Sequence, residues 1–189
     1  RNYIHLQYYI IRNDELWQEI EEVLLRKARQ GVEIRVLFDS MGCRGMKNSD
    51  WDRLEKVGIQ VAEFFPAVLG KLQLRVNYRN HRKIAVIDGR IGFVGGFNIG
   101  REYLGKDEKF GYWRDTHICI EGAAVTSLAV RFALDWNYAA RDNIFLEDHL
   151  FELPTYIRNG RDPVQIISSG PDSHSQEIRN NYLSLIHMA

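Results

Sequence analysis

The sequence predicts an α/β domain whose sheet is largely parallel at its start. Strand-like and helix-like segments alternate through the first 65 residues, an order typical of parallel strands joined by helical connections. An Asp-Gly pair between two apolar runs then predicts a β-hairpin. A long amphipathic run follows it and predicts a further helix against the sheet.

Local signals set the bounds of the elements in the first part of the chain. Strands are expected over residues 3–11, 32–38 and 59–65, which are rich in β-branched, aromatic and other apolar residues. The first helix is expected to begin at Asn13-Asp14, which offers an N-cap, and to end at Gly31. A shorter helix is expected from Ser49 to Gly58.

The hairpin is expected from Arg82–Ile87 and Arg90–Val94, which Asp88-Gly89 joins. The remaining expected elements are a strand over residues 116–120, a helix over 123–140, a last strand over 164–168 and a terminal helix over 178–189.

Composition limits the kind of partner. The 189 residues are 45% hydrophobic, which is enough for a core, and Lys+Arg and Asp+Glu balance at 25 each. No nucleic-acid partner is expected from that balance. Arg75, Arg79, Arg82 and Lys83 nevertheless gather in a stretch without acidic residues. No apolar run reaches the ~18 residues that a membrane span needs.

A faint internal repeat predicts two units. Gln18-Glu19-Ile20 recurs 158 residues later as Gln176-Glu177-Ile178, and at the same offset Asp14 falls on Asp172. We therefore expect residues 1–160 to form one domain and residues 161–189 to start a second, similar one. The chain starts at Arg1 and stops inside a helical pattern, so we expect it to be part of a longer protein.

His81 and Lys83 carry the predicted chemistry. In a strand, residues two apart point to the same face, so the imidazole and the ammonium are expected side by side. An imidazole can attack phosphorus, and a neighbouring cation offsets charge on the phosphate oxygens. Neither a metal nor another cofactor is expected, because His, Cys, Asp and Glu show no ligand spacing.

Four further residues complete the predicted site. Asp88 belongs to the same motif, but its odd spacing from His81 points it to the opposite strand face, where it supports the hairpin. Gly96 lets the backbone approach a phosphate, and Asn98 supplies an amide donor. Asp115 is the best candidate for a carboxylate that orients His81.

The full pattern is His-x-Lys-x4-Asp-x6-Gly-Gly-x-Asn. Its six fixed positions, at about 1/20 each, arise by chance on the order of once in 10⁵–10⁶ chains of this length. The pattern resembles the HKD motif of the phospholipase D superfamily. Segments spread along the whole chain resemble bacterial cardiolipin synthases; they include residues 4–10, 31–39, 77–89, 95–100, 112–117 and 168–172.

This resemblance implies a phospholipase D-like mixed sheet flanked by helices on both faces. It also implies two similar halves that share one site, in which a phosphatidyl group passes between two phosphatidylglycerol molecules through a phosphohistidine. His81 would be the nucleophile, Lys83, Gly96 and Asn98 would bind phosphate, and Asp115 would orient His81. Many relatives have Ser where this chain has Gly96, so one hydroxyl contact is missing.

The resemblance further implies an anionic phospholipid substrate, a membrane surface for the full-length protein at the cell membrane, and a second HKD half in the same chain or a homodimer. The chain taken alone is expected to be soluble and inactive or weak, because no second motif supplies the general acid. Two alternatives remain: a single-motif phosphodiesterase, phospholipase D or nuclease assembled as a homodimer, and a domain that binds phosphate without turnover.

Overall fold

Three parallel strands form the first half of the sheet. The computed structural model describes residues 2–65, 79–151, 162–170 and 173–189. In it β1 (Tyr3–Tyr8) pairs in parallel with β2 (Glu33–Asp39), which pairs in parallel with β3 (Gln60–Phe64). The helices α1 (Glu15–Arg29) and α2 (Asn48–Glu55) connect them. The predicted alternation of strands and helices is confirmed.

The start of α1 follows the predicted capping. Asp14 is the N-cap, and its Oδ1 accepts hydrogen bonds from the backbone N–H groups of Leu16 at 3.1 Å and Trp17 at 3.3 Å. These bonds satisfy donors that a helix start otherwise leaves open. After the helix, Gly31 has φ +84°, a conformation that favours glycine.

The second half of the sheet is antiparallel. The strand β4 (Ile84–Ile87) pairs with the far edge of β1, and β5 (Ile91–Gly95) and β6 (His117–Glu121) follow. The predicted hairpin is confirmed, because Asp88 (φ 53°) and Gly89 (φ 62°) form its turn. Within the described residues the six strands form one mixed sheet in the order β3-β2-β1-β4-β5-β6.

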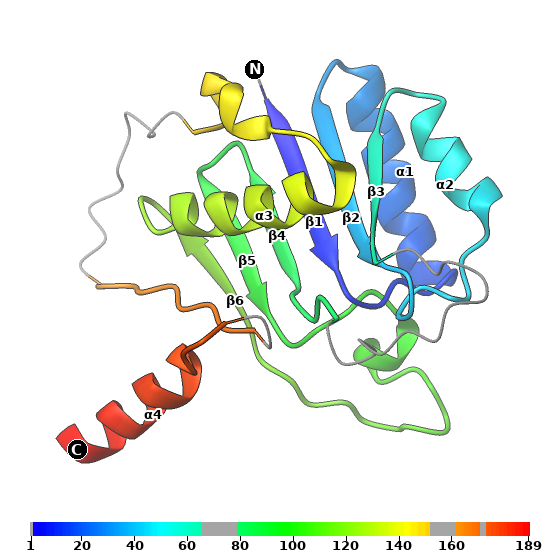
Figure 1. Ribbon diagram of the computed structural model, residues 1–189. Coiled ribbons are helices and arrows are strands. Elements are labelled where there is room, and N and C mark those ends of the chain that lie inside the picture. The colour runs from blue at the N-terminus through cyan, green and yellow to red at the C-terminus, as the bar shows by residue number, and fades with distance from the viewer. Residues whose placement is uncertain (1, 66–78, 152–161, 171–172) are drawn as a thin grey trace.

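Helices cover both faces of the sheet, as predicted (Figure 1). One face carries α1 and α2, with Trp17, Leu24 and Leu54 in its core. The other face carries α3 (Val125–Ala140), whose Leu128, Phe132 and Trp136 are buried against the strands. The short helices η1 (Arg101–Leu104), η2 (Ile144–Leu146) and η3 (Asp148–Leu150) complete this body.

The C-terminal segment differs from the prediction. Residues 164–168 were expected to form a strand, but the described stretch 162–170 makes no strand pairing. Among the described strands β3 and β6 are the edges of the sheet, and this stretch pairs with neither of them. It lies instead on the sheet face that carries α3, where Ile166 packs against the core and Ser168 accepts a hydrogen bond from Arg82 at 3.0 Å. The terminal helix α4 (Glu177–Met188) forms as predicted and projects away from the sheet (Figure 1).

Two of the predictions concern residues that the structure does not describe. One is the proposed domain boundary between residues 160 and 161, and the other is the part played by Arg75 in the cationic stretch. None of the described helices is long and apolar enough to cross a membrane.

Candidate active site

The motif lies where the carboxyl ends of β1 and β2 meet the beginning of β4. Because β4 runs antiparallel to β1, Ile84 pairs with Gln7, near the end of β1. Residues 80–83 therefore lie just outside the ladder, since β4 begins at Ile84 and not at Arg82 as predicted. Ligands of α/β sheets commonly bind at such carboxyl ends.

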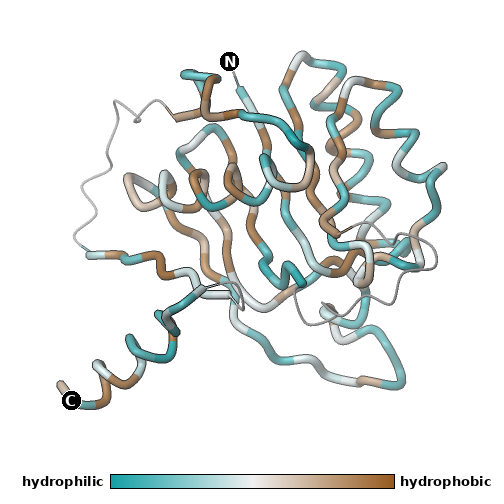
Figure 2. Tube along the Cα trace, viewed as in Figure 1, coloured by the Kyte–Doolittle hydropathy of each residue, from teal (hydrophilic) through white to brown (hydrophobic). Residues whose placement is uncertain are grey.

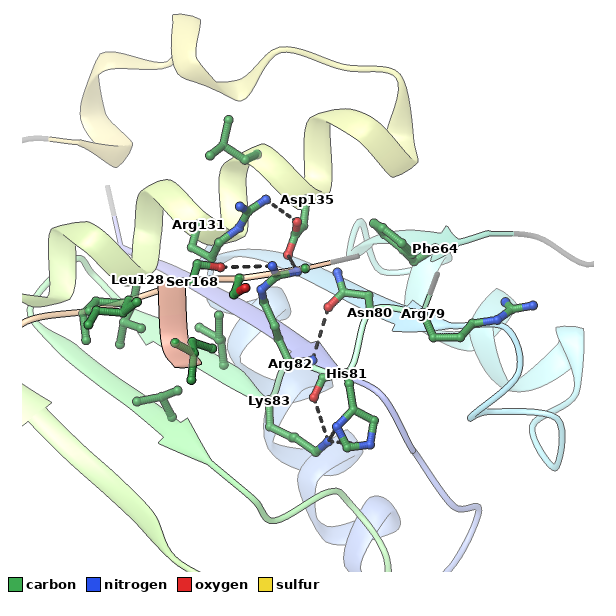
Figure 3. Close-up of a pocket in the computed structure, with 18 of the residues that line it drawn as sticks. Phe64, Arg79, Asn80, His81, Arg82, Lys83, Leu128, Arg131, Asp135 and Ser168 are labelled. Carbon is green, nitrogen blue, oxygen red and sulfur yellow. Dashed lines mark hydrogen bonds and ion pairs between the residues drawn. The ribbon is translucent and has the colours of Figure 1, made fainter. Parts of the chain in front are cut away.

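His81 and Lys83 lie side by side, although they precede the strand. Lys83 Nζ lies 3.0 Å from His81 Nδ1 and 3.4 Å from Nε2, and it donates a hydrogen bond to the His81 carbonyl oxygen at 2.7 Å (Figure 3). The His81 side chain is exposed, whereas only 3% of Lys83 is. The arrangement therefore presents an imidazole to solvent with an ammonium beneath it.

The surroundings shift both pKa values downward. Burial lowers the pKa of Lys83 to about 8, against the opposing effect of the Asp115 carboxylate. Partial withdrawal from water and the Lys83 charge lower the pKa of His81, while the Asp39 carboxylate opposes that shift. At neutral pH the pair is therefore a neutral imidazole, as a nucleophile requires, beside a protonated lysine.

Asp39 is a buried anchor of the motif that the sequence analysis missed. Its carboxylate accepts hydrogen bonds from the backbone N–H groups of Met41 at 2.8 Å and Asn80 at 3.3 Å, and it lies 3.7 Å from Arg79 Nη1. Asp39 is the last residue of the buried strand β2. A charged residue at the carboxyl end of an apolar strand was the available signal.

A buried polar network holds the motif from the other side. Gln7 Nε2 donates to Asn80 Oδ1 at 2.8 Å and to Asp135 Oδ2 at 2.6 Å, and all three residues are buried. Asp135 also pairs with Arg82 at 3.1 Å and with Arg131 (Figure 3). This network could not be predicted from the sequence, because its members lie up to 128 residues apart.

Asp115 lies against Gly96 and acts on Lys83. A Cβ at position 96 would lie 1.9 Å from Asp115 Oδ1, so any side chain there would displace the carboxylate from its present position. Asp115 accepts hydrogen bonds from Trp113 Nε1 at 3.4 Å and from the Thr116 backbone at 2.7 Å. Among the described hydrogen bonds it makes none to His81, so the expected orienting bond is not present in this structure.

Replacing Gly96 with alanine is expected to displace the Asp115 carboxylate. Because Asp115 is exposed and its carboxylate can move aside, the free energy of unfolding should fall by less than about 1 kcal/mol. The pKa of Lys83 should fall too, because its stabilising carboxylate moves away. Denaturant unfolding and a lysine NMR titration measure the two effects. Gly45→Ala is the control, since no atom lies within 4 Å of the added Cβ there. Wild-type behaviour of Gly96→Ala would contradict the expected clash.

Asn98 and Asp88 have structural partners. Asn98 Oδ1 accepts from the Ile10 backbone at 3.0 Å, and its Nδ2 donates to the Tyr103 hydroxyl at 2.6 Å, away from the cavity lining. Its contact with phosphate stays a prediction. Asp88 Oδ1 accepts from the Tyr3 backbone at 2.7 Å, at the opposite end of β4 from the motif. This position fits the expected hairpin support, and it lies apart from His81 and Lys83, with which the motif groups Asp88.

A cavity of about 820 Å³ opens beside the motif. His81, Arg79 and Arg82 line one part of it. The remainder is mostly apolar, and includes Phe64, Phe65, Leu128, Leu134, Tyr138 and Ile166. The cavity therefore places cationic groups next to an apolar wall, an arrangement that suits an amphiphilic phosphodiester.

A second cluster of charged residues is explained by an ion-pair network. Glu33, Glu147 and His149 bring their ligand atoms within 4.8 Å of one another. The buried guanidinium of Arg35 already pairs with both glutamates, at 2.7 Å for Glu147. This network fastens η3 to the start of β2, and it lies apart from the residues that line the cavity.

A mixed sheet that presents a His-x-Lys pair at the ends of β1 and β2, followed by Gly95-Gly96, defines the class of phospholipase D-like domains. Comparison with known proteins gives the family. The family described as "Cardiolipin synthase, PLD-like domain" matches residues 1–136. This chain belongs to that family, which confirms the resemblance.

Curated relatives agree over nearly the whole chain. A cardiolipin synthase of Staphylococcus aureus is 52% identical over 189 residues, or 100% of this chain and 38% of the relative. That of Oceanobacillus iheyensis is 47% identical, over 98% of this chain and 38% of the relative. The major cardiolipin synthase of Bacillus subtilis is 46% identical, over 100% of this chain and 39% of the relative. The chain thus spans about two fifths of their length.

Solved structures share the fold. NucT from Helicobacter pylori superposes with a TM-score of 0.53 and 16% identity, over 72% of this chain and 80% of that one. The phosphatidylserine synthase of Haemophilus influenzae gives a TM-score of 0.53 and 21% identity, over 71% of this chain and 31% of that one. At these identities the likeness shows the fold alone, and it confirms the predicted fold class.

Proposed function

We propose that the chain supplies the His81 half of a phosphatidyltransferase site that makes cardiolipin from two phosphatidylglycerol molecules. The contact between His81 and Lys83, 3.0 Å apart at the edge of a partly apolar cavity, carries the proposal. The 46–52% identity to cardiolipin synthases supports it.

The proposed reaction has two displacements. An imidazole nitrogen of His81 attacks phosphorus, a P–N bond forms, and the P–O bond to the leaving glycerol breaks while a general acid protonates the glycerol oxygen. A hydroxyl group of the second phosphatidylglycerol then returns its proton to that group and attacks phosphorus. The P–N bond breaks, cardiolipin leaves, and the imidazole is regenerated.

Within this scheme Lys83 offsets charge on the phosphate oxygens, and Asp115 keeps Lys83 protonated. The second amide N–H of Asn98 is a further phosphate donor in the proposal. The Gly96 N–H already donates to the Thr116 carbonyl oxygen at 2.9 Å, so Gly96 would contribute to phosphate binding only through its lack of a side chain. The general acid belongs to a second HKD half, in the same chain or in a homodimer. The full-length protein would act at a membrane surface on anionic phospholipid.

The exposed face of α4 supports a second unit. Ile178, Tyr182 and Ile186 form an apolar stripe that is 43–70% exposed. Figure 2 shows hydrophobic residues interspersed with hydrophilic ones along α4, which projects away from the sheet. At the repeat offset of 158 residues the three stripe residues correspond to Ile20, Leu24 and Ala28, which pack α1 onto the sheet. We therefore propose that residues 161–189 begin a second phospholipase D-like domain, in which this stripe would pack in the same way.

A chimeric enzyme tests the function. The 189 residues would replace the matched part of the Staphylococcus aureus relative, and cardiolipin formation from phosphatidylglycerol vesicles would be followed by mass spectrometry. Cardiolipin formation is expected from the chimera and little or none from the chain alone. Cleavage of DNA without lipid turnover would overturn the assignment and favour the nuclease alternative.

A plot of kcat/KM against pH should be bell-shaped. As pH rises through about 8, Lys83 loses its proton and phosphate loses its cation, so kcat/KM falls. On the acid side kcat/KM falls as His81 becomes protonated, at a pH below the usual histidine range because its pKa is lowered. In Lys83→Arg the guanidinium stays charged, so the alkaline fall near pH 8 should disappear even if the rate is lower. If kcat/KM of Lys83→Arg still falls near pH 8, a group other than Lys83 causes the fall.

A further inference from the structure

The ring of Tyr9 contacts both side chains of the motif. Its centroid lies 4.5 Å from that of the His81 imidazole, with the two planes tilted by 47°. Lys83 Nζ lies 5.4 Å from the same centroid, within the range of a cation–π contact. Tyr9 directly follows β1 and comes from a different part of the chain than the motif.

The main chain fixes the position of this ring. The Tyr9 carbonyl oxygen accepts a hydrogen bond from Cys43 Sγ at 3.6 Å. It also packs so closely on Gly42 that a Cβ there would lie 1.8 Å from it. The next residue, Ile10, donates its backbone N–H to Asn98 Oδ1 at 3.0 Å. These contacts hold the main chain on both sides of Tyr9, so the point from which its side chain extends is fixed relative to the motif.

The buried Lys83 ammonium needs neighbouring groups that stabilise its charge. Only 3% of the residue is exposed, and burial disfavours a charged amine. The ammonium is surrounded by the carbonyl oxygen and imidazole of His81, the Asp115 carboxylate and the Tyr9 ring. The Asp39 carboxylate acts on the neighbouring His81 imidazole. Of these, the ring contacts the ammonium and the imidazole at once.

We propose that Tyr9 is a positioning residue of the catalytic pair, whose ring face stabilises the protonated Lys83 and whose edge limits the orientations of His81. The contacts of Tyr9 stand on their own, and their part in catalysis rests on the proposed function. Both contacts are made by the ring, so Tyr9→Phe, which keeps the ring, is the reference for the test below.

A pair of isosteric rings tests the cation–π contact. Phenylalanine and 3,4,5-trifluorophenylalanine would be placed at position 9 of the 189-residue chain, and Lys83 would be titrated by ¹³C NMR with the fold checked by amide spectra. Fluorine weakens the negative ring face with little change of shape, so the pKa of Lys83 should fall by about one unit relative to Phe. The same fluorinated residue in place of Tyr182, which is 65% exposed on α4, is the control and should leave Lys83 unchanged.

Equal Lys83 pKa values for the two rings would overturn the proposal. In the chimeric enzyme, the same replacement of Phe by the fluorinated ring should shift the alkaline limb of the pH–rate profile to lower pH, by as much as the Lys83 pKa falls in the NMR titration. If the chimera makes no cardiolipin, the proposed function fails while the NMR comparison still decides the role of Tyr9. A lower rate with an unchanged alkaline limb would mean that the ring is structural only.

Discussion

Replacing His81 with alanine should lower the rate of cardiolipin formation by the chimeric enzyme by a factor of about 10⁴ or more. The expected loss is large because no covalent intermediate can form without the imidazole, and removal of a nucleophile has effects of this order in other enzymes. The side chain is exposed and the backbone of the segment is held by Asp39, so the fold should survive the change. Unchanged amide spectra and thermal unfolding would check that.

Two comparisons separate nucleophile loss from other effects. Wild-type enzyme quenched with denaturant at alkaline pH, where the P–N bond of a phosphohistidine survives, should carry a phosphatidyl adduct by intact-protein mass spectrometry, and His81→Ala should not. His149→Gln is the matched control, because His149 pairs with Glu33 away from the motif and its loss should leave the rate near the wild-type value. An adduct that persists in His81→Ala would place the nucleophile elsewhere.

Replacing Asp135 with alanine should reduce the free energy of unfolding by about 2–3 kcal/mol. Asp135 is 4% exposed and accepts from Gln7 while pairing with Arg82 and Arg131. A hydrogen bond to a charged group contributes about 1.5–3 kcal/mol, but the Arg82 and Arg131 side chains are 27% and 26% exposed, so water replaces part of what the carboxylate supplies. The two guanidinium groups would keep their charge but lose this carboxylate.

Urea unfolding followed by tryptophan fluorescence measures the effect, with Asp142→Ala as control. Asp142 follows the same helix but is exposed, so its removal should change the free energy of unfolding by less than about 0.5 kcal/mol. The loss of unfolding free energy in Asp135→Asn should lie between those of Asp135→Ala and Asp142→Ala, because asparagine removes the charge and keeps one acceptor oxygen. A loss below about 1 kcal/mol in Asp135→Ala would mean that the network contributes little to stability.

Much of the fold could be predicted because its signals are local. The Asp14 cap, the Asp88-Gly89 turn and the alternation of strands with helices each depend on residues close together in sequence. The motif could likewise be recognised from the spacing of its His, Lys, Asp, Gly and Asn residues. The failed strand at 164–168 shows the limit: an alternating pattern specifies a face but not an edge with which to pair.

The rest of the site depends on how the strands are ordered in space. Gln7, Asn80 and Asp135 meet because β1 lies between β2 and β4 with α3 across it, and the chain order does not specify that arrangement. For the same reason the contacts that Asp115 and Asn98 make within the protein were not predicted. Spacing identified them as polar residues near a motif, whereas packing against Gly96 and Tyr103 decided which way they face.

The central position of β1 has a consequence for synthesis on the ribosome. The nascent chain delivers β1, β2 and β3 first, yet the second edge of β1 has to wait for β4. At about 5–20 residues per second, the stretch between Phe64 and Ile87 takes roughly 1–5 s to emerge. During that interval an apolar strand edge has no partner and is open to association with other chains. The segment that closes this edge also brings His81 and Lys83, so assembly of the site should coincide with the end of that vulnerable period.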